Sequence, residues 1–104
     1  MQPIRTEDWE FFIYDFPAVF VYVEEGVFVS FPDLEGCISE GKTEGEAIQN
    51  AHNTLYSYVT ALVDAGKSVP DPTFLEDVQL KENEKVIMIS CVFATLFGRV
   101  TDSF

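Results

Sequence analysis

The feature that most constrains the fold of this chain is a helix with a defined beginning and end. Thr43 and Glu46 have the spacing of a capping box, in which a hydroxyl and a carboxylate each bind an unpaired amide of the first turn. Gly66 can adopt the left-handed conformation that ends a helix. Between these residues the apolar positions recur every three or four residues and form one stripe: Ala47, Ile48, Ala51, Leu55, Val59 and Leu62. One stripe predicts an amphipathic helix that covers one face of a core.

The sequence before this helix has the alternation of β-strands. Residues 18–23 and 27–31 are rich in β-branched and aromatic residues, and Glu24–Gly26 separates them as a turn, which predicts a β-hairpin. After a corner at Pro32–Gly36, residues 37–41 predict a third strand and complete an antiparallel meander. The apolar residues 9–16 either lengthen the first strand or pack over one face, and the pattern leaves both open.

The sequence after the helix predicts one more strand. Two prolines in Ser68–Pro72 forbid further helix, because each fixes its own backbone and restricts the residue before it. Residues 85–92 form a continuous apolar run, which is typical of a strand buried on both faces. A right-handed crossover through the helix would place this strand parallel to the first. We therefore expect an α+β domain over residues 1–104, with a three-stranded antiparallel meander, a parallel fourth strand and one main helix on one face (βββαβ).

Charge is the most unusual property of the composition. The 104 residues include 18 Asp and Glu against 6 Lys and Arg, for a net charge of −12, while 47% of the residues are hydrophobic. That much apolar sequence predicts a folded chain. The basic residues are scattered singly, and a field of this sign repels phosphate backbones and attracts basic partners. Direct binding of nucleic acid by these residues is therefore disfavoured.

The cysteines and the length of the apolar runs indicate where in the cell the protein is located. Cys37 and Cys91 are far apart and form no CxxC pair, which favours two buried thiols in a reducing compartment. No apolar run approaches the roughly 20 residues that cross a bilayer, and no signal peptide pattern opens the chain. We expect a soluble cytoplasmic protein without membrane contact.

The candidate chemistry is weak at each position. His52 is the only histidine, and its position in mid-helix favours a structural or surface role. Cys37 follows a turn, and we expect it to be a small apolar residue that closes the corner rather than a reactive thiolate. Metal-dependent nucleases of the ribonuclease H-like fold hold metal between carboxylates, and four carboxylates are candidates here: Asp15, Asp33, Glu40 and Glu46. Their positions in turns and in the capping box argue against convergence. No GxGxxG or P-loop motif occurs, so we expect no catalytic residues, no metal and no cofactor.

Residues 16–73 resemble the HicB family of antitoxins in one register. The resemblance rests on an aromatic-proline pair, a strand leading into a Phe-Pro-Asp-Leu corner, and a helix with a Glu-Ala and an Asn-Ala pair. Its structural residues in this chain are Pro17, Phe31, Pro32, Asp33, Gly36, Cys37, Thr43, Glu46 and Asn50. Glu35 and Lys42 depart from the family pattern, which usually has proline and often has aspartate there.

The resemblance implies a partial ribonuclease H-like domain without a nuclease site. Its expected function is to bind and neutralise HicA, a small basic toxin that cleaves messenger RNA, and the acidity of the chain fits such a partner. On exposure and charge alone, the residues expected to face the toxin are Glu24, Glu25, Asp33, Glu35 and Glu40. HicB proteins usually continue into a DNA-binding segment, and no such element follows Val92, so this segment is expected to be absent or truncated.

Two other functions remain open. The chain could be an orphan module of the same fold without a toxin, forming a homo-oligomer through an exposed sheet edge or the apolar residues Phe93–Phe97. The less favoured alternative is the metal-dependent nuclease.

Overall fold

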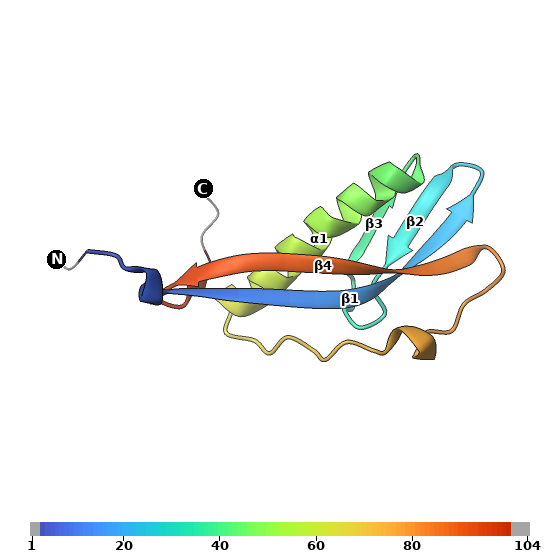
Figure 1. The fold of residues 1–104 in the computed structure, drawn as a ribbon. Helices are drawn as coiled ribbons and strands as arrows, with labels where there is room; N and C mark the ends of the chain where they lie inside the picture. Colours follow the sequence, from blue (N-terminus) through green and yellow to red (C-terminus); the bar gives the residue numbers. More distant parts are fainter. Residues whose placement is uncertain (1–2, 101–104) are drawn as a thin grey trace.

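The computed structural model describes residues 3–100, which fold into a five-stranded antiparallel sheet with one main helix on one face (Figure 1). The strands lie in the order β3-β2-β1-β4-β5, and the sheet curls into a half-barrel. The elements are β1 (Trp9–Val23), β2 (Gly26–Ser30), β3 (Ile38–Gly41), α1 (Glu44–Asp64), β4 (Glu84–Leu96) and β5 (Arg99–Val100), with short 3-10 turns at Thr6–Asp8 and Leu75–Asp77.

The predicted meander and helix are confirmed. β1, β2 and β3 pair antiparallel in sequence order, and residues 9–16 lengthen the first strand. Thr43 caps α1, because its hydroxyl oxygen accepts from the Glu46 amide at 3.1 Å, and the Glu46 carboxylate accepts from the Lys42 amide at 3.4 Å. Gly66 has a φ of +70° just beyond the helix, as predicted for its end.

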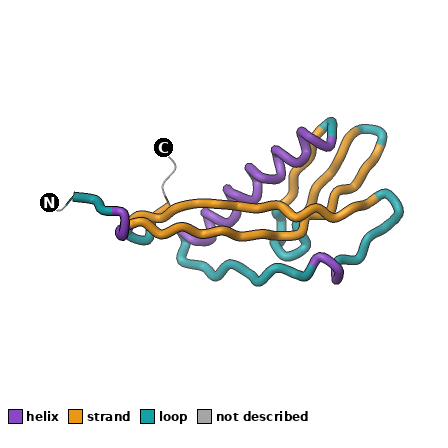
Figure 2. Tube along the Cα trace, in the orientation of Figure 1, coloured by secondary structure: helices purple, strands orange, loops and turns teal. Residues whose placement is uncertain are grey.

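The predicted parallel fourth strand is wrong. β4 pairs antiparallel with β1 over its whole length, from Trp9 opposite Leu96 to Val21 opposite Glu84. The crossover rule gives the hand of a connection between strands that are already parallel, and it does not decide whether two strands are parallel. Here residues 65–83, which we name the strap, first run back along the sheet as an extended segment (Figure 2). The chain therefore enters β4 beside the end of β1, where the Tyr22 amide donates to the Asn83 carbonyl at 2.9 Å.

The prediction that residues 85–92 are buried on both faces is also wrong. Along β4 burial alternates, so that Ile89 and Cys91 are buried whereas Met88 and Val92 are exposed. The core lies on one face, between the sheet and α1. It is formed mainly by Phe16, Ala18, Phe20, Val29, Phe31, Leu34, Cys37, Ala47, Ala51, Leu55, Val59, Ile89, Cys91 and Phe93.

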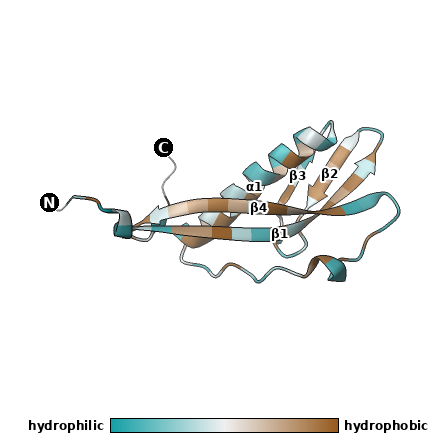
Figure 3. Cartoon of the chain, viewed as in Figure 1, coloured by the Kyte–Doolittle hydropathy of each residue, from teal (hydrophilic) through white to brown (hydrophobic). Residues whose placement is uncertain are grey.

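The molecule is elongated, with extents of 57 × 26 × 20 Å, because β1 and β4 continue beyond the short strands. We name the paired residues Trp9–Asp15 and Ser90–Leu96 the ribbon, and β2, β3 and the parts of β1, β4 and α1 around them the compact end. Figure 3 shows hydrophobic residues along β1 and β4. Of the apolar residues 93–97, Phe93, Ala94 and Thr95 are buried within β4, and residues 101–104 of the tail lie outside the described residues.

Candidate partner-binding surface

Three predicted acidic residues lie together at the compact end. Glu24 and Glu25 form the turn between β1 and β2, and Glu40 lies on β3, beside the start of β2. All three side chains are exposed. A shallow hollow of about 400 Å³ adjoins them, and its lining includes Glu25, Glu40, Lys42 and Glu46. This end of the molecule thus presents clustered carboxylates beside a concave surface.

Two glycines allow this surface to form. A Cβ atom on Gly41 would lie 2.4 Å from the Ala47 amide nitrogen, so glycine lets β3 approach the first turn of α1. Gly26 has a φ of +149°, and a Cβ atom there would lie 2.6 Å from the Gly41 carbonyl oxygen. Asn50 fixes the same junction, because its side-chain amide donates to the Glu40 carbonyl at 2.8 Å. The family-motif residue Asn50 therefore positions the strand that carries Glu40.

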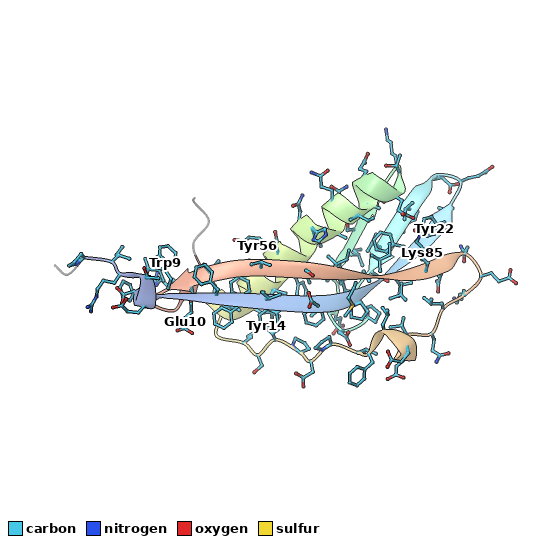
Figure 4. All side chains as sticks on the ribbon, in the orientation of Figure 1. Trp9, Glu10, Tyr14, Tyr22, Tyr56 and Lys85 are labelled. Atoms are coloured by element: carbon cyan, nitrogen blue, oxygen red, sulfur yellow. The ribbon has the colours of Figure 1, made fainter. Side chains whose placement is uncertain are left out.

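A polar cluster joins three elements at this end. The Tyr22 hydroxyl donates to the Glu44 carboxylate at 2.5 Å, and Lys85 Nζ lies 2.9 Å from the same carboxylate and 5.5 Å from the centre of the Tyr22 ring (Figure 4). The hydrogen bond from Tyr22 and then that from Lys85 lower the pKa of Glu44. The pKa of Lys85 is raised by Glu44, and burial and Glu44 raise the pKa of Tyr22. Lys85 is thus engaged with Glu44.

The other two predicted acidic residues lie at the opposite end of β2 and β3. In the corner, Phe31 and Cys37 are joined by a backbone hydrogen bond of 3.2 Å, and Gly36 has a φ of +79°. The Asp33 carboxylate accepts from the amide and the hydroxyl of Thr73, at 2.9 and 2.5 Å, and so holds the strap. Glu35 is exposed. The structure therefore separates the five residues into two groups.

The surroundings of the remaining family-motif residues indicate that these residues support the fold. Pro17, Phe31 and Cys37 are buried, whereas Pro32 is exposed at the corner. The corner is also fastened to the helix, because the Tyr58 hydroxyl donates to the Glu35 carbonyl at 2.8 Å.

The groups considered for chemistry do not form a reactive site. Burial raises the pKa of the Cys37 and Cys91 thiols to about 11, which keeps them protonated at neutral pH. His52 Nδ1 lies 3.0 Å from the Ser90 carbonyl oxygen of β4. The Asp15 carboxylate accepts from the Ser90 hydroxyl.

Across residues 3–100, no three His, Cys, Asp or Glu side chains are grouped as metal ligands, so the four candidate carboxylates are not brought together. In the same range, no helix is long and apolar enough to cross a membrane.

Sequence reasoning missed the face of the sheet that lies opposite α1. Exposed apolar side chains occur along it, including Phe11, Ile13 and Val92 on the ribbon, and Phe28 and Ile38 on the short strands. The last two line an open apolar hollow of about 490 Å³. A signal was present in residues 11–14, where apolar residues occupy both alternating positions of a strand and so predict apolar side chains on both faces.

Comparison with known proteins gives one family. The family model described as "HicB_like antitoxin of bacterial toxin-antitoxin system" matches residues 16–100. An uncharacterised 14.9 kDa protein from the rep-hol intergenic region of Haemophilus phage HP1 is 26% identical over 77 residues. That match covers 74% of this chain and 58% of the phage protein, so the chain spans less than two thirds of this relative.

Three solved structures share the fold. A toxin–antitoxin complex from Streptococcus pneumoniae gives a TM-score of 0.71 at 22% identity, covering 77% of this chain and 69% of the other. The HicA3 and HicB3 toxin–antitoxin complex gives 0.59 at 26% identity, covering 73% and 95%. The N-terminal domain of the antitoxin HicB from Burkholderia pseudomallei gives 0.61 at 24% identity, covering 73% and 95%.

Proposed function

Because the chain belongs to the HicB-like antitoxin family of bacterial toxin–antitoxin systems, we propose that it binds a small basic toxin of the HicA type and neutralises it by covering the toxin's surface. The family is non-enzymatic. Neutralisation by this chain then requires binding alone, without catalytic turnover. The affinity for the toxin comes from complementary shape and charge.

The observation that carries this proposal is the acidic compact end. Glu24, Glu25 and Glu40 are exposed, and Glu25 and Glu40 line one hollow, on a chain with a net charge of −12. A basic protein is attracted to such a surface over distances of about one Debye length, roughly 8 Å at physiological ionic strength. Its association rate therefore rises, and a covered cationic surface is no longer free to bind RNA.

The relatives support the kind of partner. The HicA3 and HicB3 complex pairs a toxin with an antitoxin that shares this fold at 26% identity. The match covers 95% of that chain. We extend the pairing of that complex to this chain as a proposal, with a HicA-type toxin as the partner.

The five acidic residues take different parts in this proposal. Glu24, Glu25 and Glu40 are the proposed toxin contacts at the compact end, and Glu35 is a contact at the corner. Asp33 stays in the proposed set at the edge of the surface, where its carboxylate also holds Thr73 of the strap. Loss of Asp33 would therefore act on the fold as well as on binding.

The experiment reverses charge at the turn. Stopped-flow mixing of the Glu24→Lys, Glu25→Lys double variant with a HicA-type toxin should show association slowed by about tenfold or more at low salt, with a flatter dependence on salt. The matched control is Glu7→Lys, Glu10→Lys, which makes the same charge change at the far end of the ribbon on exposed residues.

Comparison of the two double variants distinguishes the effect of charge at the turn from the effect of net charge on the association rate. If the control slows association as much as the turn variant does, the compact end is not the contact surface and only net charge matters. If the wild-type chain binds no HicA-type toxin, the proposed function is wrong.

A further inference from the structure

The short strands carry an open hollow on the face of the sheet opposite α1. Phe28 of β2 and Ile38 of β3 are 46% and 68% exposed and line this hollow of about 490 Å³. Phe28 pairs with Val21 on one side and with Glu40 on the other, and Ser30 pairs with Ile38. Paired residues project from the same face of a sheet, and so do residues two positions apart on one strand. We name the space between these five side chains the apolar hollow.

The apolar hollow is continuous with the hollow beside Glu25, which we name the acidic hollow. Phe28 and Glu40 line both, and the other charged residues that line the acidic hollow are Glu25, Lys42 and Glu46. Within the described residues, Glu40 alone brings a charge to the lining of the apolar hollow. An apolar surface that adjoins carboxylates in this way is complementary to an apolar side chain with basic neighbours.

We propose that the apolar hollow receives one large apolar side chain of the toxin, aromatic or aliphatic, and that a Lys or Arg beside that side chain pairs with Glu40. This assignment rests on the proposed function, and it identifies the part of the surface that retains the toxin after charge has attracted it. Most of the binding energy of an interface comes from a few large side chains that fill water-free pockets near its centre. The apolar hollow supplies such a pocket next to the acidic turn.

The shape of the apolar hollow favours a protein side chain over a free small molecule. Its volume falls within the range of about 300–1,000 Å³ that is typical of ligand pockets, but it is open to solvent. Small-molecule pockets enclose roughly 70–90% of the surface of their ligand. A side chain of a bound protein needs less enclosure, because the surrounding residues of its own chain cover the opening and exclude water.

Charge selects a basic partner over a second copy of this chain. In a two-fold dimer the same surface meets itself, so the Glu40 carboxylates of two copies, and the Glu25 carboxylates next to them, would be brought together. The chain has a net charge of −12, and like charges placed opposite each other oppose association. Nucleic acid is repelled by the same carboxylates. A cationic protein gains from them.

The experiment measures the association and dissociation rates of the full chain and a HicA-type toxin separately, by surface plasmon resonance. Ile38→Thr keeps the β-branching but removes apolar contact, so dissociation should be about fivefold faster while association changes less than about twofold. This pattern is the reverse of that expected for Glu24→Lys, Glu25→Lys, which slows association. The matched control is Ile13→Thr on the ribbon, which makes the same replacement at 69% exposure on the same face and should dissociate at the wild-type rate.

A second variant fills the apolar hollow instead of enlarging it. Ser30→Leu places an apolar side chain beside Ile38, its partner across β2 and β3. Ser30 is exposed, and the added side chain contacts its neighbour, so the melting temperature should not fall. The toxin should nevertheless dissociate about tenfold faster, because the leucine occupies the space that its side chain needs. An unchanged near-ultraviolet circular dichroism spectrum then shows that the loss of affinity does not come from unfolding.

The outcomes separate this assignment from the proposed function. If the wild-type chain binds the toxin but either Ile38→Thr or Ser30→Leu dissociates at the wild-type rate, the assignment is wrong and the proposed function stands. If Ile13→Thr accelerates dissociation as much as Ile38→Thr does, the contact is not confined to the apolar hollow, and the assignment is again wrong. A wild-type chain that binds no HicA-type toxin overturns both.

Sedimentation equilibrium of the free chain tests the other occupant. We expect Ser30→Leu and the wild-type chain to have the same mass at each concentration. If Ser30→Leu lowers the mass of the free chain and leaves the release of the toxin unchanged, a second copy occupies the apolar hollow, and the assignment to the toxin is overturned.

Discussion

The compact end and the ribbon are built on the same two long strands but differ in how completely those strands are enclosed. At the compact end β1 has β2 on one side and β4 on the other, and Phe16, Ala18 and Phe20 are fully buried. On the ribbon the aromatic side chains pack on the helix side, where the Phe93 ring lies 5.4 Å from that of Phe12. The comparison teaches that the family motifs lie where the chain itself encloses the strands.

The largest expected effect tests whether the ribbon belongs to the same cooperative unit. Phe93→Ala removes a buried ring that stacks on Phe12 and on Tyr14, with centroids 5.4 and 6.0 Å apart. We expect a loss of about 3–5 kcal/mol in the free energy of unfolding, as for Phe20→Ala at the compact end. Chemical denaturation followed by circular dichroism measures both.

The other face of the ribbon supplies the control for this pair. Phe11→Ala truncates a ring that is exposed on the sheet face opposite α1 and should change the stability of the monomer by less than about 0.5 kcal/mol. If Phe93→Ala were equally mild, the ribbon would be an appendage that unfolds separately, and the comparison between the two regions would fail.

The next effect concerns a close approach that exists only at the compact end. Gly41→Ala would place a Cβ atom 2.4 Å from the Ala47 amide nitrogen, and a backbone atom cannot move aside without shifting α1. We expect a loss of about 3 kcal/mol.

Gly36→Ala is the matched control for this variant. A Cβ atom at Gly36 meets no heavy atom within 4 Å, and only the positive φ of +79° opposes it, at about 1 kcal/mol. Thermal unfolding of both variants should rank them in this order. Equal losses would mean that backbone strain rather than helix contact determines the role of glycine here.

The sequence predicted the compact end because its signals are local. Thr43 and Glu46 mark the start of α1 within one turn, and the Pro32–Gly36 corner forces the reversal between β2 and β3. Each of these patterns depends on residues close together in the chain, so it can be interpreted without knowledge of the rest.

The ribbon and the direction of β4 depend on distant residues. Pro70 and Pro72 indicate that the helix cannot continue, but they do not indicate that the strap returns along the sheet before the next strand begins. The hydrogen bond from the Thr73 amide to the Asp33 carboxylate holds the strap, and it joins two residues that no local sequence pattern connects. The grouping of Glu24 and Glu25 with Glu40 likewise depends on the register between β2 and β3.

The buried thiols allow the two regions to be compared by pH. Burial raises the pKa of Cys37, in the corner, and of Cys91, on β4 in the ribbon, from 9.0 to about 11. A raised pKa means that the folded state holds the proton more tightly, so this contribution is complete below pH 9 and is lost as the pH rises toward 11. Two pKa units correspond to an upper limit of about 3 kcal/mol for each thiol.

Urea unfolding at pH 7 and near pH 11 measures this loss. Cys37→Ala and Cys91→Ala should each flatten the alkaline loss of stability by a similar amount, because both thiols are buried. For each variant we compare the change in the free energy of unfolding between the two pH values. The cost of the cavity left by the substitution is the same at both pH values and cancels in this difference. If Cys37→Ala alone reduces the alkaline loss of stability, and Cys91→Ala does not, then water reaches the ribbon core at high pH while the compact end stays closed.

The smallest expected effect links the two regions through α1, whose first turn caps the compact end and whose later turns cover the ribbon. Thr43→Ala removes the hydroxyl that accepts from the Glu46 amide at 3.1 Å and should lower the stability by about 1 kcal/mol, whereas Thr43→Ser keeps the hydroxyl and should lie within a few tenths of wild type. Hydrogen exchange then shows where the loss is felt. If the whole domain unfolds as one unit, Thr43→Ala reduces the protection of the Val29 amide at the compact end and of the Phe93 amide on the ribbon equally. Loss of protection at Val29 alone would mean that the ribbon is held independently of the first turn of α1.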